Sequence, residues 1–231
     1  MQTNQFPTLF QAKSLELIGN LIEVSGSAFF LVQPDMQHQG AYISNAPSDI
    51  EKSYTSTYFA LDPLNPIHFK HTDIKVATLD SQLSQQELLQ SRYYLEFMTQ
   101  YQHRYVADIF FRNARNEIIA VISLLRVKAM GDFTAQEIQL LHSVHDFMEY
   151  SLNTVYLPKR ETERNNLQDR YGLTDRELDV LEMLISGASN KEIARRIDMG
   201  IATLKTHLNH IYRKTSVQSR TELTARVLSE I

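Results

Sequence analysis

The strongest constraint on the fold lies near the carboxyl end, where three signals for the start of a helix fall within fifty residues. Each is a Ser/Thr-x-x-Glu capping box, in which the hydroxyl accepts from a free backbone N–H and the glutamate reaches back to another. The three are Thr174–Glu177, Ser189–Glu192 and Ser219–Glu222. Each precedes apolar residues at helical spacing. We therefore predict a compact, all-helical unit at the carboxyl end.

The preceding residues mix helical and strand patterns. Two further capping boxes, Ser84–Glu87 and Thr134–Glu137, occur there. The predicted elements are a helix over 11–24, a strand over 28–33 with 41–44 pairing back onto it, a hairpin of strands 105–111 and 118–126 connected by 113–116, and a long helix over 134–155. The predicted fold class is an α+β domain, with an antiparallel sheet flanked by helices, followed by an all-α domain of four helices.

A change of composition separates the two domains. Residues 158–170 hold seven charged side chains and one large apolar residue, Leu167. Such a composition is typical of a solvated linker that is helical in part. We predict an α+β domain over 1–156, a charged linker over 157–170 and the helical domain over 171–231.

Composition and charge exclude several functions. The chain has no Cys, which excludes disulfides, thiolate metal sites and a cysteine nucleophile. Its net charge is −4, yet residues 189–220 carry seven basic and two acidic side chains. A basic stripe on a small helical unit is the pattern expected for contact with nucleic-acid phosphates.

The basic stripe coincides with a helix-turn-helix pattern. On a helix turning about 100° per residue, Leu204, Leu208 and Ile211 form one apolar stripe. The opposite side carries Ala202, Lys205, Thr206, Asn209 and Arg213. This side is polar and basic, with Asn and Lys suited to base edges and Arg suited to phosphate. A preceding helix over 190–197 and a short turn over 198–200 complete the pattern.

These residues resemble the LuxR-type (GerE-like) DNA-binding domain. The matching positions are Leu173-Thr174-x-Arg176-Glu177, Val180-Leu181, Gly187, Ser189-Asn190-Lys191-Glu192-Ile193-Ala194, Thr203-x-Lys205-x-His207, Ile211, Lys214, Val217 and Arg220-Thr221-Glu222. Two positions depart from the family. Gly200-Ile201-Ala202 replaces a Ser cap and the polar residues after it, and Thr215-Ser216 replaces Leu-Gly.

The resemblance implies a four-helix bundle that dimerises through its last helix and binds double-stranded DNA. It places Lys205, Thr206 and Asn209 in the major groove. It places a second set near phosphates, namely Asn190, Lys191, Thr203, Lys214 and Arg220. The geometry above adds Arg213 as a phosphate contact.

The amino-terminal domain resembles two kinds of sensor. A phospho-receiver is disfavoured, because no early strand ends in paired carboxylates. Residues 93–141 resemble GAF/PAS-like sensor domains. The pattern Tyr54-x3-Tyr58-x3-Asp62-Pro63 is similar to that of acyl-homoserine-lactone sensors, although the chain has no Trp to match theirs. A lactone ligand is therefore an alternative that the sequence does not favour.

A pocket for a small molecule needs apolar walls and a few polar groups. Candidate walls are Phe29 or Phe30, Ile109, Phe111 and Val121. Candidate polar groups are Tyr54, Tyr58 and Asp62. One alternative is that both tyrosines only pack in the core and Asp62 only caps its turn. A second is that the domain has lost its ligand and acts purely in dimerisation.

Enzymatic and metal functions have weaker support. Three His-x2-His pairs occur, and one of them, His142 and His145, lies beside Asp146 and Glu149, so salt bridging explains it. No phosphate-binding loop, nucleophile elbow or paired-carboxylate motif is present. We expect no enzyme activity, no metal and no cofactor.

The start of the chain, MQTNQFPTLF, lacks the pattern of a signal peptide, and no apolar run is long enough to span a membrane. We therefore expect a cytoplasmic, homodimeric transcription regulator of the LuxR type, controlled by a small molecule in its amino-terminal domain. The alternative is a protein–protein regulator whose first domain binds a partner protein and whose helical domain only oligomerises.

Overall fold

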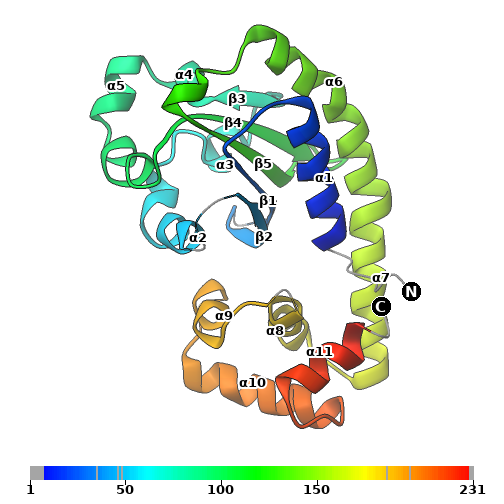
Figure 1. Ribbon diagram of the computed structural model, residues 1–231. Coiled ribbons are helices and arrows are strands. Elements are labelled where there is room, and N and C mark those ends of the chain that lie inside the picture. The colour runs from blue at the N-terminus through cyan, green and yellow to red at the C-terminus, as the bar shows by residue number, and fades with distance from the viewer. Residues whose placement is uncertain are drawn as a thin grey trace. The chain divides into compact units, whose positions relative to one another are not determined.

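The computed structural model describes residues 8–34, 36–45, 47, 49–185, 187–197 and 199–228. The chain divides into two compact units, one over 11–153 and one over 154–231 together with 1–10. Figure 1 follows the elements in chain order. No described helix is long and apolar enough to cross a membrane.

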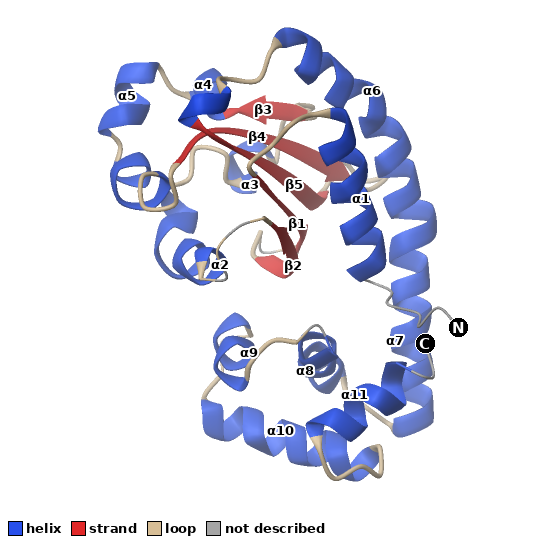
Figure 2. Ribbon diagram, in the orientation of Figure 1, coloured by secondary structure: helices blue, strands red, loops and turns tan. Residues whose placement is uncertain are grey.

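The 11–153 unit contains an antiparallel five-stranded sheet, drawn in red in Figure 2. Its strand order is β2-β1-β5-β4-β3. The strands are β1 (Gly26–Val32), β2 (His38–Ser44), β3 (Val76–Thr78), β4 (His103–Arg112) and β5 (Ile118–Val127). β1 pairs with β5, from Gly26 opposite Leu125 to Leu31 opposite Ala120. β1 and β5 are therefore neighbours in the sheet although they are far apart in the sequence.

The predicted hairpin is confirmed as β4 and β5. Asn113 builds the connection between them, because its side-chain carbonyl accepts from the backbone N–H groups of Arg115, at 2.9 Å, and Glu117, at 3.0 Å. Asn116 adopts a φ of 63°, a left-handed conformation that Asn tolerates better than most residues. The strand predicted over 28–33 and its partner over 41–44 are confirmed as β1 and β2.

The helices of this unit cover both faces of the sheet. α6 lies on one face, where the His145 ring stacks on Phe111 at 5.3 Å. On the other face, a core that includes Phe30, Phe110 and Val121 packs against short helical segments. The helical segments are α1 (Thr8–Leu21), α2 (Ile50–Ser53), η1 (Tyr54–Tyr58), η2 (Phe59–Leu61), α3 (Pro66–Phe69), α4 (Leu79–Gln82), α5 (Gln85–Gln90), η3 (Tyr93–Met98), η4 (Lys128–Met130), α6 (Ala135–Ser151) and η5 (Leu152–Tyr156).

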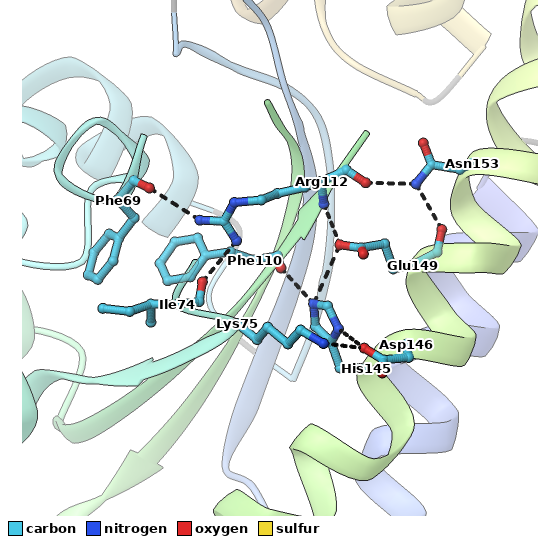
Figure 3. A network of polar contacts seen from close by, with 9 residues as sticks. All are labelled: Phe69, Ile74, Lys75, Phe110, Arg112, His145, Asp146, Glu149 and Asn153. Atoms are coloured by element: carbon cyan, nitrogen blue, oxygen red, sulfur yellow. Dashed lines mark hydrogen bonds and ion pairs between the residues drawn. The ribbon is translucent and has the colours of Figure 1, made fainter. Parts of the chain in front are cut away.

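A polar network joins α6 to β4 and to the residues before β3 (Figure 3). His145 Nε2 bonds to the Phe110 carbonyl at 2.9 Å, and its Nδ1 lies 3.0 Å from Asp146, which also pairs with Lys75 at 2.5 Å. The backbone N–H of Arg112 donates to Glu149 at 2.6 Å, and its carbonyl accepts from Asn153 at 2.8 Å. The guanidinium of Arg112 donates to the carbonyls of Ile74 at 2.9 Å and Phe69 at 3.2 Å. His145, which lies beside Asp146 and Glu149, thus connects α6 to β4.

The carboxyl-terminal unit is all-helical. Its helices are α7 (Leu157–Tyr171), α8 (Asp175–Ile185), α9 (Asn190–Arg196), α10 (Ile201–Lys214) and α11 (Arg220–Leu228). α8 to α11 surround a buried core that includes Leu181, Ile193 and Leu204. Asp198, which belongs to the predicted turn between α9 and α10, lies outside the described residues.

The segment predicted as a linker forms α7. Arg160 pairs with Glu182 of α8 at 2.6 Å, and Arg164 pairs with Asp179 at 3.1 Å. Leu167 is 8% exposed and belongs to the core of the α8–α11 bundle. α7 therefore packs as part of the carboxyl-terminal unit, and it ends at Gly172, whose φ of 63° reverses the chain.

Four of the five predicted capping boxes form both of their bonds. At Ser84, Thr134, Thr174 and Ser189, the hydroxyl accepts from the N–H of the glutamate three residues on, and that glutamate accepts from the N–H of the cap. At Ser219 only the first bond forms, because Glu222 accepts from the N–H of Gln218 instead.

Candidate nucleic-acid interface and ligand cavity

α10 has the two faces that the sequence predicts. Leu204 and Ile211 are 0% exposed and Leu208 is 5% exposed. The polar residues of the opposite side are exposed, namely Thr203, Lys205, Thr206, Asn209 and Arg213. Gly200 caps the helix with backbone alone, since its carbonyl accepts from Leu204 N at 3.0 Å. The side of α10 opposite its apolar stripe is therefore polar and exposed.

Two predicted phosphate-contacting residues also have partners within the protein. Lys214 Nζ donates to Glu177 Oε2 at 2.7 Å and to the Gly172 carbonyl at 2.6 Å. Arg220 donates to the Leu184 carbonyl at 2.8 Å. Both side chains are half-buried, whereas those of Asn190 and Lys191 are exposed.

Glu177 is a buried charge at the start of α8, with 3% of its surface exposed. Burial acts to raise the pKa of its carboxyl group, but the hydrogen bonds from Lys214 and Thr174 outweigh burial and lower that pKa overall. The carboxylate is therefore ionised, and Lys214 is its counter-ion.

The second candidate site is a cavity in the 11–153 unit, between the sheet and α2, η1 and η3. It encloses about 620 Å³ of space not filled by atoms, the part open to solvent included. The lining residues are Ala28, Phe30, His38, Ala41, Ile43, Ile50, Glu51, Tyr54, Asp62, Tyr93, Phe97, Val106, Ser123 and Leu125.

The structure brings two of the three predicted ligand-binding residues together in this cavity. Tyr54 Oη donates to Asp62 Oδ2 at 2.7 Å. Asp62 Oδ1 accepts from Leu64 N at 2.8 Å, so Asp62 caps its own turn as well. Tyr58 does not line the cavity. Its hydroxyl donates to Glu96 at 3.4 Å, and its ring lies 5.1 Å from that of Phe97.

A second carboxylate lies beneath the cavity. Asp108 of β4 is 3% exposed and accepts a hydrogen bond from Ser123, a lining residue. Desolvation by burial raises the pKa of Asp62 and, more strongly, that of Asp108. Repulsion by the nearby Asp62 carboxylate also raises the pKa of Asp108.

His38 packs in the aromatic wall of the cavity. Its ring stacks on Phe30 at 3.5 Å and on Tyr54 at 5.4 Å, and it meets Phe59 edge-on at 4.9 Å. Burial lowers the pKa of His38 to about 3, so the ring is neutral at pH 7. Its Nε2 has no hydrogen-bond partner among the described residues.

Most of the predicted walls were wrong. Phe30 lines the cavity, but Phe29 and Phe111 stack on each other at 6.4 Å, and Phe111 packs on His145 of α6. Ile109 does not line it either, and Val121 packs in the core beside it. For Phe29, Ile109 and Phe111 the reason is the alternation of side chains along a strand, since neighbouring residues point to opposite faces.

Sequence analysis missed most of the residues that line the cavity. The single signal was Asp108, a charged residue within the apolar strand YVADIFF. Charged side chains are almost never fully buried without a partner, so that position could have been identified as a candidate for the site. His38, Tyr93 and Phe97 carried no comparable signal.

Comparison with known proteins gives one family and several relatives. Residues 172–227 match the family model described as "Bacterial regulatory proteins, luxR family". The monoamine regulon transcriptional regulator of Klebsiella aerogenes is 32% identical over 219 residues, which cover 93% of this chain and 88% of that protein. The nitrate/nitrite response regulator protein NarL of Escherichia coli K12 is 34% identical over 104 residues, 45% of either chain.

Among solved structures, SdiA of Escherichia coli is similar over 93% of this chain and 87% of its own, with a TM-score of 0.44 and 17% sequence identity.

Proposed function

Since the chain belongs to the luxR family of bacterial regulatory proteins and is a DNA-binding transcriptional regulator, we propose that a small molecule in the cavity of the 11–153 unit controls its binding to DNA. The protein works in the cytoplasm as a homodimer that binds double-stranded DNA and has no enzymatic role. Dimerisation is assigned to α11, as in the DNA-binding domains that the sequence resembles.

On the DNA side, Lys205, Thr206 and Asn209 read base edges in the major groove. Thr203, Asn190, Lys191 and Arg213 contact phosphates, and Lys214 and Arg220 do so in addition to their contacts within the protein. The observation that carries this assignment is the exposure of the polar side of α10 opposite its buried leucines. Asn can form two hydrogen bonds to an adenine edge, and lysine can donate to guanine.

On the ligand side, the carrying observation is the Tyr54–Asp62 pair inside a cavity with mostly apolar walls. A buried carboxylate and hydroxyl that face unfilled space can fix the orientation of a ligand, and the apolar walls supply affinity. The Klebsiella relative is named for a monoamine regulon, so amines belong among the compounds tested.

The test is DNA binding by the full chain, measured by fluorescence anisotropy on fragments selected from the genome of its source. We expect specific binding whose affinity falls steeply with salt and changes when a metabolite extract is added. Specific binding that no extract fraction alters contradicts control by a small molecule. No salt-dependent binding to any fragment favours the alternative, a protein–protein regulator.

A further inference from the structure

The cavity of the 11–153 unit differs from an ordinary apolar pocket in the charge of its polar groups. This inference rests on the proposed control by a small molecule. We propose that the ligand is a small organic cation, a protonated amine on an apolar body, with Asp62 as its counter-ion.

The first argument is the sign of the charges. Asp62 and Glu51 line the cavity, and Asp108 lies beneath Ser123 of the lining. Among the described lining residues there is no Lys or Arg, and the one histidine, His38, is neutral at pH 7. An anionic ligand would find no cationic partner among these side chains, whereas a cation would lie beside carboxyl groups that can ionise as its counter-ions.

The second argument is the deficit of positive charge around Asp62. The carboxylate accepts hydrogen bonds from Tyr54, Leu64 and Tyr93, all neutral donors. Desolvation nevertheless raises its pKa above the usual value. An ammonium group placed beside the carboxylate would supply the missing counter-charge and favour its ionised form.

The third argument is the aromatic wall. The rings of Phe30, Tyr54, Tyr93 and Phe97 line the cavity together with His38. Tyr54 and Tyr93 lie 5.6 Å and 5.4 Å from Phe97, measured between ring centroids. The faces of phenyl and phenol rings attract cations, and rings grouped around a small space hold ammonium ligands.

The apolar walls and the unpaired nitrogen define the rest of the ligand. Ala28, Ala41, Val106 and Leu125 leave apolar surface for a hydrocarbon or aromatic body. His38 Nε2 lacks a partner among the described residues and can accept a hydrogen bond from a ligand N–H or O–H. A primary monoamine on a ring or short chain matches all of these groups.

The test compares amines with neutral molecules of the same shape. The full chain is titrated by calorimetry with 2-phenylethylamine, hexylamine and butylamine, each beside its alcohol, and with hexanoyl-homoserine lactone as a neutral amide. We expect at least one amine to bind at least tenfold more tightly than its alcohol. Thermal melting is recorded with each compound as a second readout.

The variants are D62N, which keeps the shape and removes the charge, and Y54F, which keeps the charge and removes one hydrogen bond. D62N is expected to weaken amine binding at least tenfold and Y54F by less. D132N is the matched control, because Asp132 also accepts from a nearby backbone N–H but does not line the cavity. Should D62N fail to fold, the comparison of each amine with its alcohol on the wild type decides the proposal.

The outcomes separate this inference from the proposed function. Equal binding of amine and alcohol, or of amine to the wild type and to a folded D62N, overturns the cationic ligand. Binding of the lactone alone, with loss in Y54F, also overturns it but leaves control by a small molecule intact. If no amine binds while metabolite extract still changes DNA binding, the inference is wrong and the proposed function stands.

Discussion

Lys214 Nζ lies 2.7 Å from Glu177 Oε2, so the last turn of α10 neutralises a buried carboxylate at the first turn of α8. The same glutamate also closes the capping box of α8 with Thr174. One carboxylate therefore stabilises the start of α8 and positions the end of α10.

We expect K214A to lower the free energy of unfolding of the carboxyl-terminal unit by about 1–3 kcal/mol, because it leaves a buried charged acceptor without its strongest donor. Arg213 is the matched control, an exposed base one residue away. R213A should leave the melting temperature unchanged and reduce the salt dependence of DNA binding by about one unit, as loss of one phosphate contact does. Equal melting temperatures for K214A and wild type would contradict the structural role of the pair.

Asn209 and Leu208 are neighbours on opposite sides of α10. N209A is expected to weaken binding to the specific site by about 1–3 kcal/mol, with little change on random DNA, because a bidentate amide contact discriminates between bases. L208A removes a core side chain and should instead cost about 2–5 kcal/mol of stability. Anisotropy titrations and thermal melting distinguish the two. If a folded N209A–K205A double variant bound the specific site as tightly as the wild type, the assignment of these residues as base contacts would be contradicted.

Asp62 should make stability depend on pH with an unusual sign. Its pKa in the folded protein lies above the usual value of 3.8, so the folded carboxyl keeps its proton where the unfolded chain has lost it. The free energy of unfolding should therefore fall as the pH rises from about 4 through the folded-state pKa. Asp108 acts in the same direction, and the other titratable neighbours are Tyr54, Tyr93 and His68.

In D62N, we expect the free energy of unfolding to fall less steeply with rising pH, and the melting temperature of the unliganded protein at pH 7 to be higher. Urea titrations between pH 4 and pH 8 measure the effect. An unchanged pH profile in D62N would show that Asp62 has an ordinary pKa.

The α7 helix should be needed for the carboxyl-terminal unit to be stable by itself. A fragment over 154–231 keeps Leu167 in the core and the pairs of Arg160 and Arg164 with α8. A fragment over 172–231 loses them, and a core of that size is marginal. We expect circular dichroism to show a higher melting temperature for the longer fragment. Identical melting curves would mean that α7 is a linker in function, although helical.

The sequence predicted local structure well. Leu204, Leu208 and Ile211 are buried as their spacing required, and four of the five capping boxes form both of their bonds. Such features depend on residues three or four apart on one helix, so a short window of sequence determines them.

The cavity could be predicted only in part. Tyr54 and Asp62 are eight residues apart, and their contact follows from a local turn. Ser123, Asp108 and His38 come from three strands, and their approach depends on the pairing order of the sheet. Pairing between distant strands has no local signature, so the sequence left these residues unassigned.

The same pairing order delays the pairing of β1 with β5 during synthesis of the chain. β1 ends at Val32, and β5, its central partner, begins only at Ile118. At a translation rate of about 5–20 residues per second, roughly 4–17 s pass between synthesis of the apolar segment AFFLV of β1 and the start of β5. During that interval only β2 can pair with it. Slower synthesis or lower temperature during expression lengthens the exposure of this strand, so chaperone supply, rather than the stability of the finished protein, is expected to limit the yield of soluble material.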